Sequence, residues 1–337
     1  MTPPSPLIPE VDFDKSGAQH GFVRLFHSVH RSAYGYIPIP IVVLRNGEGP
    51  TALFISGTHG DEYEGQVALC NLARTLKPEH IQGRVILLPA ANLPAAVAGL
   101  RTSPIDDGNL NRLFPGDPLG TPTQQIAHFI ETELVARADM VVDLHSGGSS
   151  LHYVPSVLMM QDDADPARQA KMVAALKAFA SPIAYVGHAS PGQGAVRTTS
   201  GAALRAGKPS LGTELGGSGT VTKAALQVAE RGLRNILAHM GLTDASTAQP
   251  GPTRVLDVAG PDYFTYAPGT GLWEPLAEPG DTVRAGQPAA RIHTPETPWA
   301  PAETIAFARD GYVLCKRMPG RVVRGDCLFH LGTDLGW

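Results

Sequence analysis

The sequence lacks several features that define large classes of proteins. It has three cysteines, Cys70, Cys315 and Cys327, and no C-x-x-C pair. A disulfide framework and a site of paired thiolates are therefore excluded, and a reducing cytoplasm is favoured. We expect each cysteine to be a small core residue. No basic block is present and the net charge is -4, which argues against a nucleic-acid partner.

Long apolar runs are also missing. No stretch reaches the roughly 20 apolar residues that span a membrane. Residues 1–17 lack a basic segment followed by an apolar one, so no secretory signal is expected. The motifs G-x-S-x-G and H-E-x-x-H, a P-loop and a complete G-x-G-x-x-G are all absent. The hydrolases and nucleotide-binding folds that depend on these motifs are therefore disfavoured.

What remains is an ordinary globular composition. The chain has 337 residues, 43% hydrophobic and 17% charged, which is enough for more than one domain. Alternating apolar runs and helical patterns predict an α/β domain over residues 1–245, with a mixed, mostly parallel sheet covered by helices. Expected strands are 22–29, 36–44, 52–55, 84–89, 140–144, 155–160, 183–186 and 210–213; expected helices are 66–76, 122–137, 166–179 and 221–240; expected long loops are 92–120 and 187–207.

The C-terminal part, residues 254–337, follows a polar, proline-bearing linker at 243–253 and has a different character. Its short β-type runs are broken by Pro-Gly and Ala-Gly turns. Residues 278–287, with a weaker echo at 322–328, resemble the turns of barrel-sandwich modules, but no lysine stands in a matching turn. We expect an all-β barrel-sandwich-like module that shapes the site or makes a contact in a homo-oligomer.

Residues 59–65, H-G-D-E-Y-E-G, have the spacing of a metal site. His59 and Glu62 stand three residues apart after a predicted strand, so an imidazole nitrogen and a carboxylate can reach one point. Two of the three protein ligands of a catalytic zinc ion are often supplied in this way. The alternative is a helix start, with Asp61, Glu62 and Glu64 as first-turn acids and His59 in solvent.

A third ligand is expected from another strand end. His145 ends the predicted strand 140–144 and is the best choice among the 12 histidines; the alternative is a histidine that merely caps a strand in the core. Asp143 lies on the same face of that strand and could bind the second imidazole nitrogen, as carboxylates behind zinc ligands do. Asp61 could do the same for His59. The prediction is one zinc ion per chain.

Amide hydrolysis also needs a base and groups that hold the substrate. Glu214, a carboxylate at the end of an apolar strand, is predicted to be the general base; the alternative is a structural ion pair with an arginine. Arg112 offers a planar fork for a carboxylate and Asn111 adds an amide donor. Arg101 could stabilise the developing oxyanion. Arg197 is a further substrate-binding candidate, and ordinary loop salt bridges are the alternative for each arginine.

Four segments in this order resemble the succinylglutamate desuccinylase/aspartoacylase family of zinc amidohydrolases, which are relatives of the zinc carboxypeptidases. The segments are HGDEYEG at 59–65, NLNRLFPG at 109–116, DLHSGG at 143–148 and TELGG at 213–217. The resemblance covers roughly residues 52–240. It implies zinc on His59, Glu62 and His145, with Glu214 as the base.

The resemblance also implies a substrate, a small N-acyl amino acid whose carboxylate is held by Asn111 and Arg112. The family's loop often reads Asp-Leu-Asn-Arg, and Asn109 stands here in place of that Asp. Within the family, the loop at 101–116 and the C-terminal module look most like enzymes of ectoine breakdown. Those enzymes remove acetate from an amino acid with an amine in its side chain. The acids available for that ammonium are Asp106, Asp107 and Asp117.

Two alternatives remain. The first is the same chemistry on N-acetylaspartate or N-succinylglutamate, whose second carboxylate would favour a second dedicated arginine. The second is a non-catalytic binding protein that retains the fold, which the presence of every expected catalytic residue disfavours.

Overall fold

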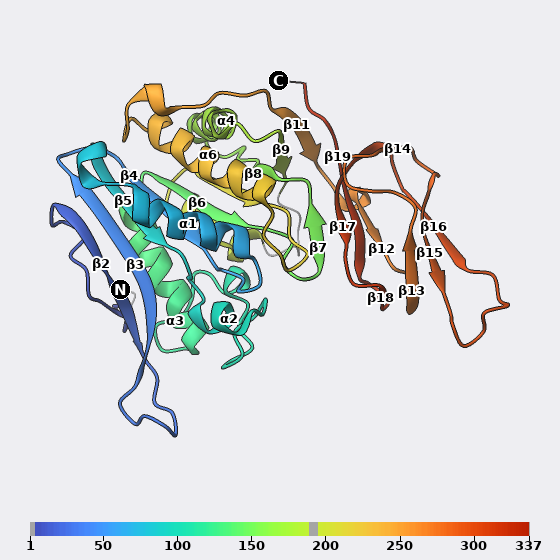
Figure 1. Cartoon of the computed structure of the whole chain (residues 1–337), viewed down its shortest axis with the longest axis horizontal. Coiled ribbons are helices and arrows are strands. Elements are labelled where there is room, and N and C mark those ends of the chain that lie inside the picture. Colours follow the sequence, from blue (N-terminus) through green and yellow to red (C-terminus); the bar gives the residue numbers. More distant parts are fainter. Residues whose placement is uncertain (1–3, 189–194, 337) are drawn as a thin grey trace.

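The structure, a computed structural model, describes residues 4–188 and 195–336. Within these residues, one hydrogen-bonded sheet of 15 strands extends across the molecule (Figure 1). Thirteen strands follow one another in the order β1 (Ile8–Pro9), β2 (Gly17–Phe26), β3 (Tyr36–Asn46), β5 (Gly83–Leu88), β4 (Thr51–Ser56), β6 (Met140–His145), β10 (Ser210–Glu214), β8 (Ser156–Met160), β9 (Ile183–Gly187), β11 (Arg254–Val258), β19 (Cys327–Asp334), β17 (Gly311–Arg317) and β14 (Thr282–Val283). The predicted mixed α/β fold is confirmed.

The centre of the sheet is parallel. Strands β5, β4, β6 and β10 run in the same direction, whereas β8 is antiparallel to β10 and parallel to β9. Every residue of β4 and all but the last of β6 are buried, as expected of strands with helices on both faces. The register places Ser56 opposite Leu144 and His145 opposite Glu214. The carboxyl ends of β4, β6 and β10 therefore lie side by side.

Helices cover both faces of this centre and bury two separate cores (Figure 1). One face carries α1 (Tyr63–Thr75), α4 (Pro166–Phe179) and α6 (Lys223–His239); the other carries α2 (Leu93–Ala98), α3 (Pro122–Phe129) and α5 (Thr199–Arg205). In the part of the chain that the structure describes, no helix combines the length and apolar character needed to cross a bilayer.

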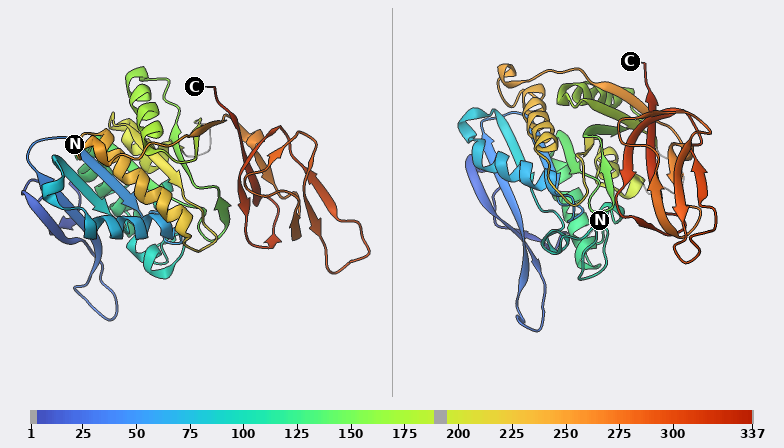
Figure 2. Two further views of the ribbon diagram at one scale, coloured as in Figure 1. Left: turned by 45° about the horizontal axis from the view of Figure 1, so that its top comes forward. Right: turned by 45° about the vertical axis from the view of Figure 1, so that its right-hand side comes forward.

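The C-terminal strands extend the large sheet and add a second one (Figure 2). β11 pairs with β9 of the α/β part, β12 (Phe264–Tyr266) pairs with β19, and β7 (Leu151–Tyr153) pairs with β17. The smaller sheet consists of β16 (Glu303–Ala306), β15 (Pro288–His293), β13 (Gly271–Pro275) and β18 (Arg321–Val322). A third apolar core fills this region and includes Trp273, Phe307 and Phe329.

Several local predictions need correction. Both stretches expected to be long loops contain a short helix, α2 in the first and α5 in the second, and β7 was missed. The helix expected over 122–137 is a regular α-helix only to Phe129. It continues as a π-helical turn (Ile130–Leu134) and then a 3₁₀ turn (Val135–Arg137). Residues 189–194 of the second stretch lie outside the described residues.

Cys70 is exposed and is not the core residue that we expected. The buried face of α1 is formed by Glu64, Gly65, Ala68, Leu69 and Leu72, and Cys70 points away from this face. Cys315 is buried, as expected, and Cys327 is half-buried.

The packing of α6 on α4 can be tested at Gly232. A Cβ atom there would lie 2.2 Å from ring atoms of Phe179. Gly232→Ala should therefore lower the free energy of unfolding by about 1–3 kcal/mol, because the added methyl group overpacks the core. This loss acts against the higher helix propensity of alanine, which favours a helix over glycine by up to about 1 kcal/mol. Urea denaturation measures the difference, with Gln227→Ala on the exposed face of α6 as control. An unchanged or higher stability of Gly232→Ala would contradict this packing.

Candidate active site

The loop after β4 is shaped by two glycines. Gly57 has a φ of +65° and turns the chain at the strand end. Gly60 passes so close to α2 that a Cβ atom would lie 2.0 Å from the backbone carbon of Ala95. Only glycine fits there, and the close approach fixes His59 and Glu62 between β4 and the first turn of α1.

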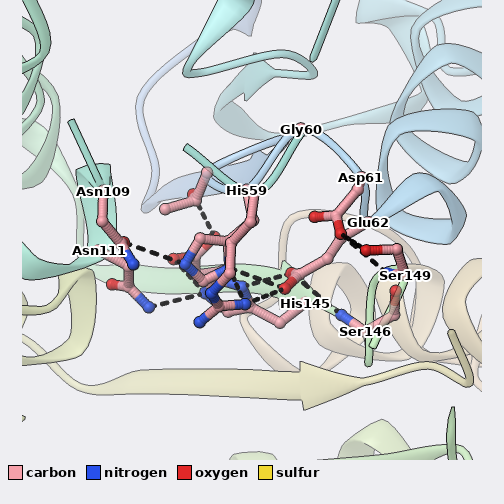
Figure 3. Close-up of polar contacts among 12 residues, drawn as sticks. His59, Gly60, Asp61, Glu62, Asn109, Asn111, His145, Ser146 and Ser149 are labelled. Carbon is pink, nitrogen blue, oxygen red and sulfur yellow. Dashed lines mark hydrogen bonds and ion pairs between the residues drawn. The ribbon is translucent and has the colours of Figure 1, made fainter. Parts of the chain in front are cut away.

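His59, Glu62 and His145 form a compact cluster (Figure 3). The carboxylate of Glu62 lies between the two imidazoles, with Oε1 2.7 Å from Nδ1 of His59 and Oε2 2.7 Å from Nδ1 of His145. One ligand atom from each residue lies within 4.8 Å of the other two. Two imidazole nitrogens and one carboxylate oxygen are the donor set of a catalytic zinc site, so these residues fit a metal ion.

The outer nitrogens of both imidazoles have oxygen partners. Nε2 of His145 lies 2.9 Å from Oδ2 of Asp143, and Oδ1 of Asp143 accepts a bond of 3.0 Å from the Thr58 hydroxyl. Nε2 of His59 lies 3.2 Å from the Asn109 side-chain oxygen. When an oxygen accepts the Nε2 proton, Nδ1 keeps its lone pair for a metal ion. Asp143 thus lies where the sequence suggested.

The pKa values of the cluster show that the buried Glu62 carboxylate is stabilised by positive charge nearby. Burial opposes ionisation of Glu62, but the two imidazoles outweigh it and hold its pKa far below the ordinary value. Burial also opposes protonation of His145, yet Asp143 and Glu62 raise its pKa well above the usual range. For His59, burial outweighs the attraction to Glu62, and the pKa of its imidazole is lowered. A metal ion bound between these atoms would replace the proton on His145.

Glu214 lies beside this cluster at the end of β10 and lines the same cavity. Its Oε2 is buried and has no hydrogen-bond partner among the described residues, where it also forms no ion pair with an arginine. Burial and the charge of Glu62 raise its pKa to about 8. The structural alternative of a Glu–Arg pair therefore has no support in the described part of the chain.

Two further acids of the 59–65 loop fasten neighbouring loops. Oδ2 of Asp61 accepts bonds of 2.8 Å from both the backbone N–H and the hydroxyl of Ser149 (Figure 3). Oε1 of Glu64 accepts the N–H of Gly217 at 3.0 Å. Asp61 is thus not the partner of His59 that the sequence allowed. The sequence pattern indicated only a possible first-turn acid at Glu64, whose pKa is raised by burial.

The predicted substrate groups lie at one side of the cavity. Arg101 reaches Glu62, with Nη1 3.3 Å from Oε1, and its side chain is 46% exposed. Arg112 is exposed and lines the cavity, as does Asn111. The Asn111 amide nitrogen is 3.2 Å from Nε2 of His145, and its oxygen accepts the N–H of Thr199 at 3.0 Å.

Four other predicted residues are not among the described residues that line the cavity. Arg197 is exposed, and its backbone oxygen accepts the N–H of Phe114. Asp106 is tied to the start of α3 by the N–H and hydroxyl of Thr123, each at 2.7 Å. Asp107 and Asp117 are both exposed. None of the three acids is therefore placed to receive a substrate ammonium.

The cavity has a volume of about 350 Å³ and extends from the cluster to the C-terminal strands. Its lining also includes aromatic residues to which no sequence pattern pointed, namely Tyr153, Tyr185, Phe264 and His330. They come from four separate segments of the chain, so no motif marked them.

The role of Asp143 can be tested through metal affinity. Asp143→Asn keeps the size of the side chain but weakens its hold on Nε2 of His145, and should lower metal affinity about 10- to 100-fold. Competition with a chromogenic chelator measures this. Asp163→Asn, at an exposed aspartate, is the control. Equal affinities in both variants would show that Asp143 does not orient the ligand.

The chain is similar to known proteins in both sequence and fold. Residues 48–240 match the model of the succinylglutamate desuccinylase/aspartoacylase catalytic domain. The chain is 42% identical to N-alpha-acetyl-L-2,4-diaminobutyric acid deacetylase of Halomonas elongata over 96% of this chain and 94% of that protein.

Two solved structures are similar to this chain over nearly its whole length. The product-bound ectoine utilization protein EutE (DoeB) of Ruegeria pomeroyi has a TM-score of 0.93 at 40% identity, over 98% of this chain and 99% of the other. A succinylglutamate desuccinylase/aspartoacylase of Rhodobacter sphaeroides has a TM-score of 0.92 at 41% identity over the same shares. The chain belongs to the succinylglutamate desuccinylase/aspartoacylase family.

Proposed function

We propose that the chain is a zinc-dependent deacetylase that hydrolyses N-alpha-acetyl-L-2,4-diaminobutyrate to acetate and L-2,4-diaminobutyrate. The observation that carries this proposal is the convergence of His59, Glu62 and His145 on one point, with Glu214 in the same cavity. The substrate follows from the 42% identity to the Halomonas elongata deacetylase and the likeness to an ectoine utilization protein.

The metal site would consist of His59, Glu62 and His145, with one zinc ion per chain. Zinc bound there supplies a Lewis acid that polarises the acyl carbonyl and makes water a better nucleophile. His145 is held in orientation by Asp143, and His59 by Asn109. The N–H of Ser146, 3.2 Å from Oε2 of Glu62, fixes the carboxylate between them.

Glu214 would act as the base and then as the acid. Its unpartnered Oε2 takes a proton from the attacking water and delivers it to the leaving α-nitrogen as the C–N bond breaks. Binding of a divalent cation nearby would lower the pKa of Glu214 from its raised value, because a positive charge favours the carboxylate. The base form would then be present at neutral pH.

Arg101 and Arg112 would bind two different groups of the substrate, the acyl carbonyl and the α-carboxylate. Arg101, which lies beside Glu62, would bond the carbonyl oxygen as negative charge develops on it. Arg112 and Asn111 would hold the α-carboxylate through a planar fork and an amide donor. Arg197 is a candidate at the rim, because the next residue, Thr198, lines the cavity.

The division of the chain is also proposed. We assign residues 1–245 to the catalytic part and 254–337 to a β-rich module of barrel-sandwich type. The two antiparallel layers around the third core support this form, although β11 continues the catalytic sheet.

We also propose that the protein works in the reducing cytoplasm, because its three cysteines are free.

A substrate panel on zinc-loaded protein tests the proposed activity. Release of the free amine from N-alpha-acetyl-L-2,4-diaminobutyrate should exceed release from N-acetylaspartate and N-succinylglutamate, because those two carry a second carboxylate. Preference for either of these two substrates would move the assignment to aspartoacylase or desuccinylase activity. Zinc-loaded protein that hydrolyses none of them would favour a non-catalytic binding protein.

The base assignment has its own test. Glu214→Gln should reduce kcat about 100- to 10,000-fold, because proton transfer to and from water and the leaving nitrogen is lost. Zinc content, measured by atomic absorption, should remain at one ion per chain. Glu303→Gln, at an exposed glutamate of β16, is the control. A Glu214→Gln protein with wild-type kcat would assign the proton transfers to another group.

A further inference from the structure

Part of the cavity is lined by rings that the proposed reaction does not use. We name it the aromatic wall, and it consists of Tyr153, Tyr185, Phe264 and His330. These residues belong to β7, β9, β12 and β19. The wall is therefore built where the C-terminal strands meet the catalytic sheet, and the C-terminal part contributes two of its four rings.

His330 is the centre of the wall. Its ring stacks on Phe264 with centroids 4.4 Å apart and planes 9° apart. The rings of Tyr185 and Tyr153 meet it nearly at right angles, at 5.6 and 5.9 Å. Only 4% of His330 is exposed, with 7% of Tyr185 and 8% of Tyr153. Such packing holds the wall in one arrangement.

The wall is uncharged at neutral pH. Burial lowers the pKa of His330 to about 3, so its imidazole carries no positive charge. Burial also raises the pKa of Tyr153 and Tyr185 well above the usual value, so both phenols keep their protons. What the wall offers a ligand is aromatic surface and a few lone pairs.

One lone pair is without a partner. Nε2 of His330 is buried and makes no hydrogen bond within the described residues, whereas Nδ1 lies 3.4 Å from the Tyr153 hydroxyl. With the proton on Nδ1 and donated to that hydroxyl oxygen, Nε2 is an acceptor. A buried acceptor without a partner is costly, and a ligand that donates an N–H would remove the cost.

Cations of the protein lie elsewhere. The arginines among the described residues that line the cavity are Arg101 and Arg112, and both belong to the loop beside the metal cluster. His188 lines the cavity too, but its Nε2 is 2.7 Å from Oδ1 of Asp257, so it is already paired with a carboxylate of the protein. A substrate carboxylate at the wall would be desolvated without a cationic partner.

An ammonium group has the opposite preference. The faces of aromatic rings attract cations, and the attraction is strongest where water is excluded. We propose that the aromatic wall is the subsite for the side-chain ammonium of the substrate, and that it makes the site select an N-acyl diamino acid over an N-acyl dicarboxylic acid. This proposal rests on the proposed function and names the residues that give it its substrate.

The test compares the cationic substrate with a neutral one of the same shape. In N-acetyl-L-norvaline a methyl group stands where the diaminobutyrate derivative has its ammonium. Phe264→Leu keeps apolar bulk but removes a ring face. It should lower kcat/KM for N-alpha-acetyl-L-2,4-diaminobutyrate about tenfold and leave kcat/KM for N-acetyl-L-norvaline within about twofold of wild type.

The control is Tyr312→Leu, which removes a half-buried aromatic ring of β17 that does not line the cavity. It should change neither kcat/KM value, and thermal melting shows that both variants are folded. If Phe264→Leu and Tyr312→Leu reduce activity on both substrates alike, the effect is structural and the subsite assignment is overturned. Equal activity of the wild type on both substrates would overturn it as well.

A binding measurement separates this inference from the proposed function. Calorimetry on the zinc-loaded wild type should show L-2,4-diaminobutyrate bound at least about tenfold more tightly than L-norvaline, and Phe264→Leu should remove most of that difference. If this preference is found but neither N-acetyl substrate is hydrolysed, the proposed function fails and the subsite stands. If both are hydrolysed but the two amino acids bind equally, the function stands and the subsite fails.

Discussion

The structure depends on one buried carboxylate, that of Glu62, held between two imidazoles. A buried anion is tolerated only with a cation or several hydrogen-bond donors near it, and Glu62 has His59, His145, Arg101 and the N–H of Ser146. The same arrangement that satisfies the carboxylate presents two nitrogens and one oxygen to a common point. The residues that satisfy the buried carboxylate are thus the same residues that form the candidate metal site.

The parallel sheet provides the geometry for this feature. β4, β6 and β10 end at the same edge, and their register sets His145 beside Glu214. The 59–65 loop then connects the three strand ends, because Asp61 binds Ser149 and Glu64 binds Gly217. The loop therefore positions the proposed base as well as the proposed metal ligands. The C-terminal strands complete the cavity from the other side.

Much of this could be predicted from the sequence because strand ends carry their own signals. The apolar runs before His59 and His145 are clear, a short strand pattern precedes Glu214, and parallel strands bring their carboxyl ends together. The short helices α2 and α5 were hidden in polar, glycine-rich stretches. Cys70 was misplaced because it lies off the buried face of α1. The aromatic wall was missed because Phe264 and His330 come from distant strands, and only tertiary packing reveals them.

The central claim is that one divalent ion sits among His59, Glu62 and His145. Anomalous X-ray diffraction from crystals of zinc-loaded protein, recorded on both sides of the zinc absorption edge, tests it most directly. The account predicts a single strong peak within about 2.0–2.2 Å of both Nδ1 atoms and a Glu62 oxygen. A peak elsewhere on the chain, with none at this cluster, would contradict it.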